Sequence, residues 1–494
     1  MNPEAAGPEA ADPEGAGSEA AGTEPSSPHT RSPEAAGPGI GAVLAELVPY
    51  PEDGTRADGP VAVDATDRLL LDEAAPLIAR DPSGVVVLGD RFGALTVGAL
   101  ALGAHGVRVH QDAITAEKAL VANAARASRS LWTAHRRAVE HQLPADEPVG
   151  AGITGYDLFE PRLLTDARLV LLQLPASLAE LTEIAEHVAR YADPAVTLLA
   201  GGRVKHMTHA MNDVLGASFA QVSASLARQK SRLLIAREPR SDVGPLTYPV
   251  TARLTDRELL DAVVPREAPP DRTTHDGTTH DRTVRPSPAG LTVVAHGAAF
   301  AGATLDLGTR FLLAQAHRWP ELSDTQATSS YDTPVPGMDA RPVAVDLGCG
   351  TGILATVLAL RYPGARVLAS DRSAAACAST AATLAANGVE ATVVRDDAGG
   401  ALPVPDGSAD LVLLNPPFHD RAALSTDAAH RMFATAGRIL RAGGELWTVF
   451  NTGLHYRRAL ERAVGPTEHV AQDRKFTVTR SLRKVLTDGS VAGG

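Results

Sequence analysis

The sequence predicts an α/β protein made of two tandem copies of one domain, each a mostly parallel sheet with helices on both faces. Two observations lead to this fold class. Short apolar runs alternate with helical segments in both halves of the 494-residue chain, and such alternation is typical of a parallel sheet with crossover helices. Three stretches of the first half also return, in the same order, in the second half, which indicates a duplication.

The repeated stretches are a strand with its loop, a second strand with its helix, and the end of a later strand. They pair "VVVLGDRFGALTV" (85–97) with "VAVDLGCGTGILATV" (343–357), "VHQDAITAEKALVANAA" (109–125) with "LASDRSAAACASTAATLAANG" (368–388), and "LVLLQLPAS" (169–177) with "LVLLNPPFH" (411–419). The step from the last glycine of the loop to the acid after the second strand is 19 residues in each half, from Gly93 to Asp112 and from Gly352 to Asp371. We therefore expect Asp112 and Asp371 to be equivalent.

Five apolar runs of the second half are expected to be strands, because they recur at the intervals that βα units require. They are "PVAVDLG" (342–348), "ARVLASD" (365–371), "EATVVRD" (390–396), "ADLVLLN" (409–415) and "GELWTVF" (444–450). The helical stretch "AAACASTAATLAANG" (374–388) is expected to end at Asn387-Gly388, which is a C-cap signal. A ligand of such a sheet binds at the carboxyl ends of the strands.

Low-complexity segments indicate the domain boundaries. Residues 1–40 repeat Pro-Glu-Ala-Ala-Gly variants and have too few large apolar side chains to form a core, so we expect a disordered acidic tail. The stretch 265–290 duplicates Thr-Thr-His-Asp, which is more typical of a linker insertion than of a metal site. The expected parts are the tail 1–40, a first domain 41–250, a linker 251–290, a second domain 291–486 and a flexible end 487–494.

Composition excludes several classes of protein. The chain is 44% hydrophobic and 21% charged, as in soluble globular proteins. Its two cysteines, Cys349 and Cys377, are too few for a disulfide framework and lack metal-ligand spacing, which favours a reducing cytoplasm. No apolar stretch is long enough to span a membrane, so we expect no membrane span. The N-terminus is not a basic segment followed by an apolar one, so we expect no signal peptide.

The net charge of −12 is concentrated at one end of the chain. Residues 1–60 hold eleven acids and two arginines, which leaves the rest of the chain close to −3. Basic residues gather there in three clusters: Arg126, Arg129, Arg136 and Arg137; Arg228, Lys230 and Arg232; Arg474, Lys475, Arg480, Arg483 and Lys484. Each cluster is either a solvated face or a contact for nucleic-acid phosphates.

A glycine loop and two acids indicate a nucleoside ligand in the second domain. The loop Asp346-Leu-Gly-Cys-Gly-Thr-Gly352 follows the first strand, and Gly348, Gly350 and Gly352 allow close approach of a ligand. Asp371 ends the second strand, where its carboxylate can accept both ribose hydroxyls. Asp397, with Asp396 as the competing candidate, is placed to accept from an adenine amino group. Helix capping is the alternative role of each acid, and the ligand is either a dinucleotide or S-adenosylmethionine.

The stretch Asn415-Pro416-Pro417-Phe418 decides between these ligands. The Asn415 side-chain carbonyl and the Pro416 backbone carbonyl can both accept hydrogens of an exocyclic amine, and thus aim its lone pair at a sulfonium methyl. The two prolines stiffen this geometry, and Phe418 offers a ring on which a flipped base can stack. The alternative is a plain Pro-Pro loop with Phe418 in the core. The adjacent His419 either holds the loop or assists proton removal.

These motifs carry a family resemblance. "VDLGCGTG", "ASD" and "NPPF" together resemble class I S-adenosylmethionine-dependent methyltransferases that act on exocyclic amines. "GATLDLGTRFLL" (302–313), "NPPFHD" (415–420), "AGGEL" (442–446) and "AQDRKFTVTRSL" (471–482) are similar to the two-domain ribosomal RNA guanine-N2 methyltransferases. The resemblance covers nearly the whole chain, apart from the tail and the 265–290 insertion.

The resemblance implies two Rossmann-like domains with sheets of the seven-stranded type and S-adenosylmethionine as cofactor. It implies that Thr309 and Arg310 lie over the cofactor, that Asp346, Gly348, Gly350, Gly352, Asp371, Asp397 and Thr309 bind it, and that Asn415, Pro416, Pro417 and Phe418 are catalytic. It implies ribosomal RNA or a ribosomal subunit as partner, with small-subunit 16S RNA slightly preferred over large-subunit 23S RNA. We expect a monomer, with no metal and no membrane partner.

The first domain is expected to be a degenerate copy. Its loop "LGDRFGA" places Asp90, Arg91 and Phe92 where the second copy has small residues, and its "QLPA" lacks the aromatic ring and the double proline. Bulk and charge in the loop would fill the methionine site. We therefore expect this half to dock RNA or to act as a scaffold, through phosphate contacts of its arginines.

Two other functions compete with the leading one. Protein-glutamine and DNA-adenine amine methyltransferases share Asn-Pro-Pro, but they commonly have Tyr next and lack a degenerate twin. A ribosome-assembly or RNA-binding protein with vestigial methyl transfer is the third hypothesis. The intact Asp346, Asp371 and Asn415 argue against it.

Overall fold

The structure is a computed structural model that describes most of the chain. It describes residues 39–50, 61–131, 152–158, 160–242, 244–264, 289–322, 341–398, 402–417 and 422–484, apart from the side chains of 422–426. The acidic tail to residue 38, residues 265–288 of the insertion, Phe418, His419 and the end 487–494 lie outside this part of the chain. Pro38–Gly494 forms one compact unit, and every contact described below lies within it.

Two seven-stranded sheets have the same strand order, β3-β2-β1-β4-β5-β7-β6 and β12-β11-β10-β13-β14-β16-β15. In each sheet only the sixth strand of this order, β7 or β16, runs antiparallel to its neighbours. The first sheet consists of β1 (Val85–Leu88), β2 (Val107–His110), β3 (Ile153–Gly155), β4 (Leu169–Gln173), β5 (Thr197–Arg203), β6 (Phe219–Ala224) and β7 (Ser231–Pro239). The second consists of β10 (Val343–Leu347), β11 (Arg366–Asp371), β12 (Thr392–Arg395), β13 (Ala409–Leu414), β14 (Leu440–Asn451), β15 (Thr467–Gln472) and β16 (Phe476–Leu482). The predicted tandem duplication and the mostly parallel sheets are confirmed.

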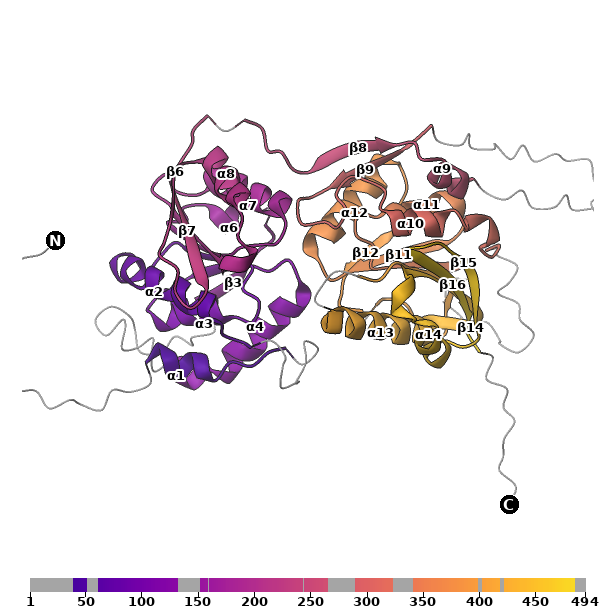
Figure 1. The fold of residues 1–494 in the computed structure, drawn as a ribbon, viewed down its shortest axis with the longest axis horizontal. Helices are drawn as coiled ribbons and strands as arrows, with labels where there is room; N and C mark the ends of the chain where they lie inside the picture. The colour runs from indigo at the N-terminus through magenta and orange to yellow at the C-terminus, as the bar shows by residue number, and fades with distance from the viewer. Residues whose placement is uncertain are drawn as a thin grey trace, which may run out of the picture. The chain divides into compact units, whose positions relative to one another are not determined.

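Helices cover both faces of each sheet (Figure 1). The first copy has α1 (Ile40–Ala45), α2 (Ala65–Arg80), α3 (Ala94–Ala101), α4 (Ile114–Arg126), α6 (Pro161–Leu164), α7 (Leu178–Tyr191) and α8 (His209–Ser218). The second has α9 (Arg257–Val263), α10 (Leu307–Leu313), α11 (Ile353–Arg361), α12 (Ala374–Ala386), α13 (Ala422–Ile439) and α14 (Arg457–Ala463). Successive residues of β1 belong to different apolar clusters, Val87 to one and Leu88 to the other, because side chains alternate along a strand.

The strands and helix predicted for the second half are present with small changes at their ends. The prediction for 409–415 corresponds to β13, and that for 444–450 is the central part of the longer β14. Helix α12 has Asn387 as its C-cap residue, and Gly388 follows with φ of 64°. The C-cap prediction is therefore confirmed.

The structure differs from the predicted linker 251–290. Strand β8 (Val250–Leu254) pairs antiparallel with β9 (Leu291–Ala295), and β9 packs on α12. Helix α9 buries Leu259, Ala262 and Val263 in an apolar cluster of the second copy. Residues 251–264 are thus folded with the second copy, because the low-complexity composition begins only at Pro265.

Strand register also corrects the pairing of Asp112 with Asp371. In the first sheet Leu88 lies opposite His110, and in the second Leu347 lies opposite Ser370. The residue after His110 is Gln111, so Gln111 and not Asp112 is the counterpart of Asp371. The first copy is one residue shorter between its loop and this position, which spacing alone does not reveal when two polar residues follow each other.

Candidate functional site

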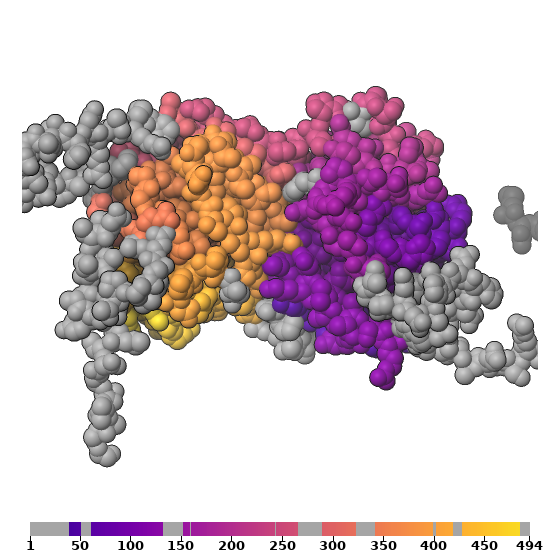
Figure 2. Space-filling model, turned by 180° about the vertical axis from the view of Figure 1, so that it is seen from behind, coloured from indigo at the N-terminus to yellow at the C-terminus, as the bar shows by residue number. Residues whose placement is uncertain are grey.

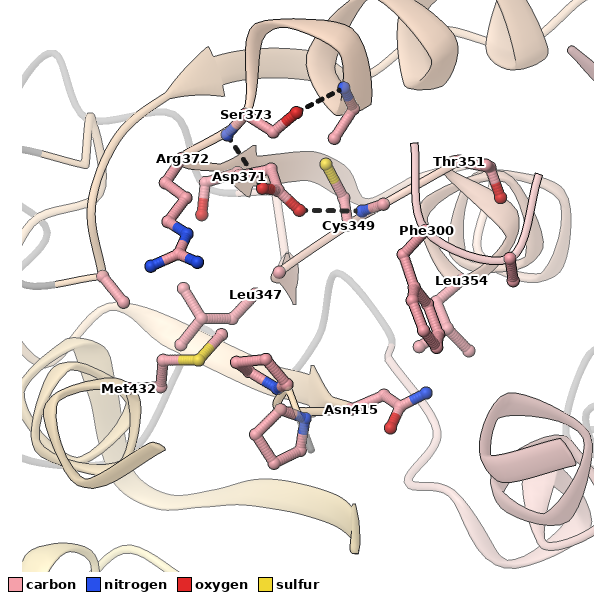
Figure 3. Close-up of a pocket in the computed structure, with 18 of the residues that line it drawn as sticks. Phe300, Leu347, Cys349, Thr351, Leu354, Asp371, Arg372, Ser373, Asn415 and Met432 are labelled. Atoms are coloured by element: carbon pink, nitrogen blue, oxygen red, sulfur yellow. Dashed lines mark hydrogen bonds between the residues drawn. The ribbon is translucent and has the colours of Figure 1, made fainter. Parts of the chain in front are cut away.

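A cavity of about 390 Å³ opens at the carboxyl ends of the second sheet. The ends of four neighbouring strands and the loops after them line it, with residues 347–351 at the end of β10, 371–373 at the end of β11, 396–398 after β12 and 415–417 after β13. The segment between β9 and α10 contributes Phe300, Asp306 and Thr309. Figure 3 shows Asp371, Cys349 and Asn415 around this space. The cavity therefore brings together the glycine loop, the acids and the Asn-Pro-Pro stretch that the sequence singled out.

The glycine loop approaches other groups at two of its positions. Gly350 has φ of 54°, and a Cβ there would meet nothing within 4 Å, so its face is open to the cavity. Gly352 has φ of 78° and is the N-cap residue of α11, and a Cβ there would come within 2.8 Å of the Thr380 Cα on α12. Gly348 also has a positive φ and lines the cavity. Glycine is thus required at 352 for packing and is open to a ligand at 350.

Asp346 lies below this loop and not on the cavity wall. Its side chain is fully buried, and its Oδ2 accepts a hydrogen bond of 2.9 Å from the Ala355 N–H in the first turn of α11. Its Oδ1 has no hydrogen-bond partner within the described structure. Burial raises the pKa of Asp346 to about 7, and the charge of Asp371 acts in the same direction. Asp346 therefore holds the start of α11 beneath the loop.

Asp371 lies on the cavity wall and is held at both oxygens. Oδ2 accepts from the Gly350 N–H at 3.0 Å, and Oδ1 accepts from the Ser373 N–H at 3.0 Å (Figure 3). Each carboxylate oxygen has a second lone pair, so both can still accept from a ligand. Burial raises the pKa of Asp371.

The two candidates for the adenine acceptor, Asp396 and Asp397, differ in their partners. Both line the cavity. The Arg431 guanidinium of α13 donates to both oxygens of Asp397, each at 3.3 Å. The Oδ2 of Asp396 is buried, and the described structure offers it no hydrogen-bond partner. Burial raises the pKa of Asp396.

Asn415 has its amide oriented by α10. Its Nδ2 donates to Thr309 Oγ1 at 3.0 Å and to Asp306 Oδ1 at 3.3 Å, while its Oδ1 is buried and has no partner within the described residues. Pro416 is buried, Pro417 is exposed, and both line the cavity. The orientation of the amide is therefore fixed by α10, and its acceptor oxygen makes no hydrogen bond to the described residues.

Asp306 is a site residue that the sequence analysis missed. It is the N-cap of α10 and accepts from the N–H groups of Gly308 at 2.9 Å and Thr309 at 3.1 Å. The signal was present, since an Asp directly before an apolar run is an N-cap pattern. Phe300 was missed as well, and it is a 58% exposed aromatic ring at the cavity. Arg310, in contrast, pairs with Asp256 and Glu258 and is not among the residues that line the cavity.

The first copy has different side chains at the equivalent positions. Asp90 takes the place of Cys349, and its Oδ2 accepts from the Thr96 N–H at 2.8 Å, which is the capping bond that Asp346 makes in the second copy. Phe92 is 3% exposed, and the Arg91 guanidinium lies 4.9 Å from the centre of its ring. Gln173, at the place of Asn415, donates to Asp67 of α2. The loop of this copy is thus filled by its own side chains.

Comparisons with known proteins agree with this arrangement. Residues 290–480 match the family model for the methyltransferase small domain, and residues 45–240 match that for the RLMG N-terminal domain. The ribosomal RNA large subunit methyltransferase G of Streptomyces avermitilis is 32% identical over 448 residues, which is 89% of this chain and 97% of that protein. The protein of the same name from Pseudomonas aeruginosa PAO1 is 31% identical over 439 residues, 88% of this chain and 96% of that protein.

This chain belongs to the ribosomal RNA large subunit methyltransferase G family. Membership makes it an S-adenosylmethionine-dependent methyltransferase of class I. A solved T. thermophilus 16S rRNA N2 methyltransferase, in complex with AdoMet and guanosine, is 20% identical and covers 85% of this chain and 92% of its own, with a TM-score of 0.57. That likeness shows the shared tandem fold.

Proposed function

We propose that this protein transfers a methyl group from S-adenosylmethionine to the N2 amine of a guanine in 23S ribosomal RNA. The observation that carries the proposal is the Asn415 amide at the cavity wall, whose NH2 is held by Thr309 and Asp306 while its buried oxygen has no partner in the described structure. The motif resemblance slightly favoured 16S RNA. The relatives' names favour the large subunit, and we follow them.

The residues around the cavity suit the cofactor. The ribose hydroxyls would donate to the free lone pairs of Asp371, and the open face of Gly350 gives a methionine chain room beside the loop. The unpaired Asp396 Oδ2 can accept from the adenine amino group, and Asp397 offers a second acceptor that is shared with Arg431. Gly348 and Thr309 complete the wall, while Asp346 and Gly352 support the loop from behind.

The chain's own part in the chemistry is positioning. S-Adenosylmethionine supplies an electrophilic methyl group on a sulfonium. Asn415 Oδ1 and the Pro416 carbonyl would accept the two hydrogens of the guanine amine, so that its lone pair points into the cavity. Because the amine becomes a strong acid once it is methylated, a solvent water can take its proton. The rigid Pro416-Pro417 backbone keeps these acceptors aligned, and alignment is a large contribution to such transfers.

Aromatic rings on the rim would hold the target base. Phe418 follows the two prolines in the sequence and keeps its proposed stacking role, although it lies outside the described residues. Phe300 offers a further exposed ring. Stacking of a base on an aromatic ring contributes about 1–3 kcal/mol, which compensates part of the energy needed to unstack it from the RNA.

Basic residues near the same sheet edge would contact RNA phosphates. The turn between β15 and β16 carries Arg474 and Lys475, and it lies at the carboxyl edge because Asn451 of β14 pairs with Phe476 of β16. In the first copy, Arg228 and Lys230 occupy the corresponding turn between β6 and β7. We propose that the first copy docks ribosomal RNA or a ribosomal subunit through such contacts, and that the protein acts as a monomer in the cytoplasm, where its substrate is.

No metal or membrane requirement enters this proposal. Within the described ranges, no group of three His, Cys, Asp or Glu side chains is arranged to hold a metal ion. Among the described helices, none has the length and apolar character needed to cross a bilayer.

The test is methyl transfer in vitro from isotope-labelled S-adenosylmethionine. Naked 23S RNA, naked 16S RNA, assembled large subunits and duplex DNA are offered separately, and the product nucleoside is identified by mass spectrometry. We expect N2-methylguanosine in 23S RNA or the large subunit. Label in 16S RNA alone, in N6-methyladenine or in a protein of the subunit would overturn the proposed substrate, while failure of the wild-type protein to bind the cofactor would overturn the proposed activity.

A further inference from the structure

The degenerate first copy supplies a side chain to the N-terminus of a helix in the active copy. Asp112, which follows β2, accepts at its Oδ1 from the Ala375 N–H and from the Ser373 hydroxyl, both at 2.9 Å. Its backbone carbonyl accepts from the Ala374 N–H at 2.8 Å. The first N–H groups of a helix have no partner within the helix, and here α12 receives two of its caps from the other copy.

This helix end is next to the groups that face the cavity. Ser373 directly follows Asp371-Arg372, and its N–H donates to Asp371 Oδ1 at 3.0 Å. On the same helix, the Thr380 hydroxyl donates to the Gly350 carbonyl at 3.0 Å. A shift of α12 therefore moves both the ribose-facing acid and the glycine loop.

The first copy also donates a hydrogen bond to the second copy, and two of its residues line the cavity. The Ile114 N–H at the start of α4 donates to the Arg372 carbonyl at 2.9 Å, and Ala113 forms a bridge with Ser373. Asp112 and Ala113 both line the cavity, together with the residues of the second sheet. Figure 2 shows the purple surface of the first copy adjoining the orange surface of the second.

A second carboxylate of the first copy binds the segment between β9 and α10. Glu183 on α7 is 1% exposed and accepts from the Gly297 N–H at 2.8 Å and from His296 Nδ1 at 2.7 Å. A Cβ at Gly297 would come within 2.4 Å of the Ala179 carbonyl oxygen, so the backbones of the two copies are in close contact there. Of the residues that follow, Ala298, Phe300 and Ala301 line the cavity.

We propose that Asp112 is a positioning residue for the cofactor site of the active copy, and that the degenerate copy is therefore required for full affinity for S-adenosylmethionine. Asp112 fixes the N-terminus of α12, and α12 in turn fixes Asp371 and the glycine loop. Glu183 fixes His296 and Gly297, at the start of the segment that leads to α10. The loop of the first copy is filled by its own side chains, and this copy instead positions two segments beside the cofactor site of the second copy. The inference rests on the proposed function only in that S-adenosylmethionine is the ligand.

The experiment measures S-adenosylmethionine affinity by calorimetry in the full-length protein. Asp112→Ala removes the cap, and we expect affinity to fall about tenfold, the scale of one lost charge-assisted hydrogen bond. Asp112→Asn keeps an amide oxygen that accepts the same two bonds, and we expect affinity close to wild type. The KM for RNA should be unchanged in both variants, which separates positioning of the cofactor from general damage.

Glu117→Ala is the matched control, because Glu117 pairs with Arg395 across the same contact at 2.9 Å and leaves the Asp112 side chain and its bonds to α12 in place. It should bind like wild type. Should Asp112→Ala fail to fold, Asp112→Glu carries the test, since it keeps the charge but misplaces the acceptor and should weaken binding. Wild-type affinity in the folded Ala or Glu variant, or an equal loss with Asn, would overturn the inference. Absence of binding by the wild-type protein itself would instead count against the proposed function.

Discussion

The N-terminal and C-terminal copies share a strand order but differ in the loop after their first strand. The outer glycines are kept, with φ of 70° at Gly89 and 86° at Gly93 against 83° at Gly348 and 78° at Gly352. The middle glycine, Gly350, is replaced by Arg91. The outer positions serve the turn and the helix packing, and the middle position serves the ligand. The positions of this loop that the fold requires can therefore be separated from the position that is open to a ligand.

The carboxylates that cap the first crossover helix also differ between the two copies. In both copies a carboxylate accepts from the third N–H of the first crossover helix, Ala355 in one and Thr96 in the other. The active copy places this carboxylate on the strand, at Asp346, which leaves the loop free. The degenerate copy places it in the loop, at Asp90. The cap is kept because the helix needs it, while its position decides whether a ligand fits.

The largest effect is expected when the middle glycine is exchanged between copies. Gly350→Arg should abolish S-adenosylmethionine binding at concentrations that saturate wild type, because the new side chain would extend into the open space at this position. Binding is measured by calorimetry, and thermal unfolding checks that the variant is folded.

The reverse exchange is the control for that experiment. Arg91→Gly should leave one binding site per chain, because Asp90 and Phe92 still fill the first loop and Gln111 stands where Asp371 is needed. A second site in Arg91→Gly, or normal binding in Gly350→Arg, would contradict the division of roles within the loop.

The next effect concerns the two equivalent amides. Asn415→Ala should lower the rate of methyl transfer on the order of 100-fold, because misplacement of a reacting group costs about this much. Cofactor affinity should stay within about twofold, as expected for an interaction with the substrate alone. Gln173→Ala, at the same place in the first copy, should leave the rate unchanged. Equal loss in rate and in cofactor affinity for Asn415→Ala would show that Asn415 supports the fold of the site instead.

The smallest expected effect concerns how Asp67 of the first copy makes protein stability depend on pH. Burial raises the pKa of Asp67 to about 7 from 3.8, although the Asp64 N–H favours its charged form. The active copy has Thr309 at this place. As pH rises from about 4 to about 7, the unfolded chain loses this proton while the folded chain keeps it, so Asp67 makes stability fall over that window.

Asp67→Thr should therefore gain in unfolding temperature relative to wild type as pH rises, on the order of 2–4 °C between about pH 4 and about pH 8. Scanning calorimetry at several pH values measures the difference. If the difference in unfolding temperature between Asp67→Thr and wild type stays constant across this pH range, Asp67 is not a buried, protonated group.

Local pattern was enough to predict the fold and the gathering of several candidate site residues at one cavity. The duplication, the strands of the second half, the C-cap at Asn387 and the meeting of Asp371 with Asn415 all follow from periodicity and from the rule that parallel strands end at one edge. The degenerate loop was also readable, since Arg91 and Phe92 have no place beside a bound ligand. These features depend on residues close in sequence or on a topology that the pattern implies.

What sequence reasoning missed depends on partners far along the chain. Nothing near Asp112 indicates that it caps α12, which is more than 250 residues away. Likewise, Arg431 reaches Asp397 from α13, and Gln111 takes the register of Asp371 because one residue is missing between the loop and β2. Strand β8 was assigned to a linker because its partner β9 lies beyond the insertion.

The pairing of β8 with β9 bears on how the protein can be divided. A fragment that starts at residue 291 would leave β9 as an unpaired edge and would strip the apolar surface that Leu259, Ala262 and Val263 cover. Exposed edges of this kind promote self-association. A C-terminal fragment that keeps this pairing must therefore start near Val250, upstream of the low-complexity segment, and it would still lack the contacts that Asp112 and Glu183 supply.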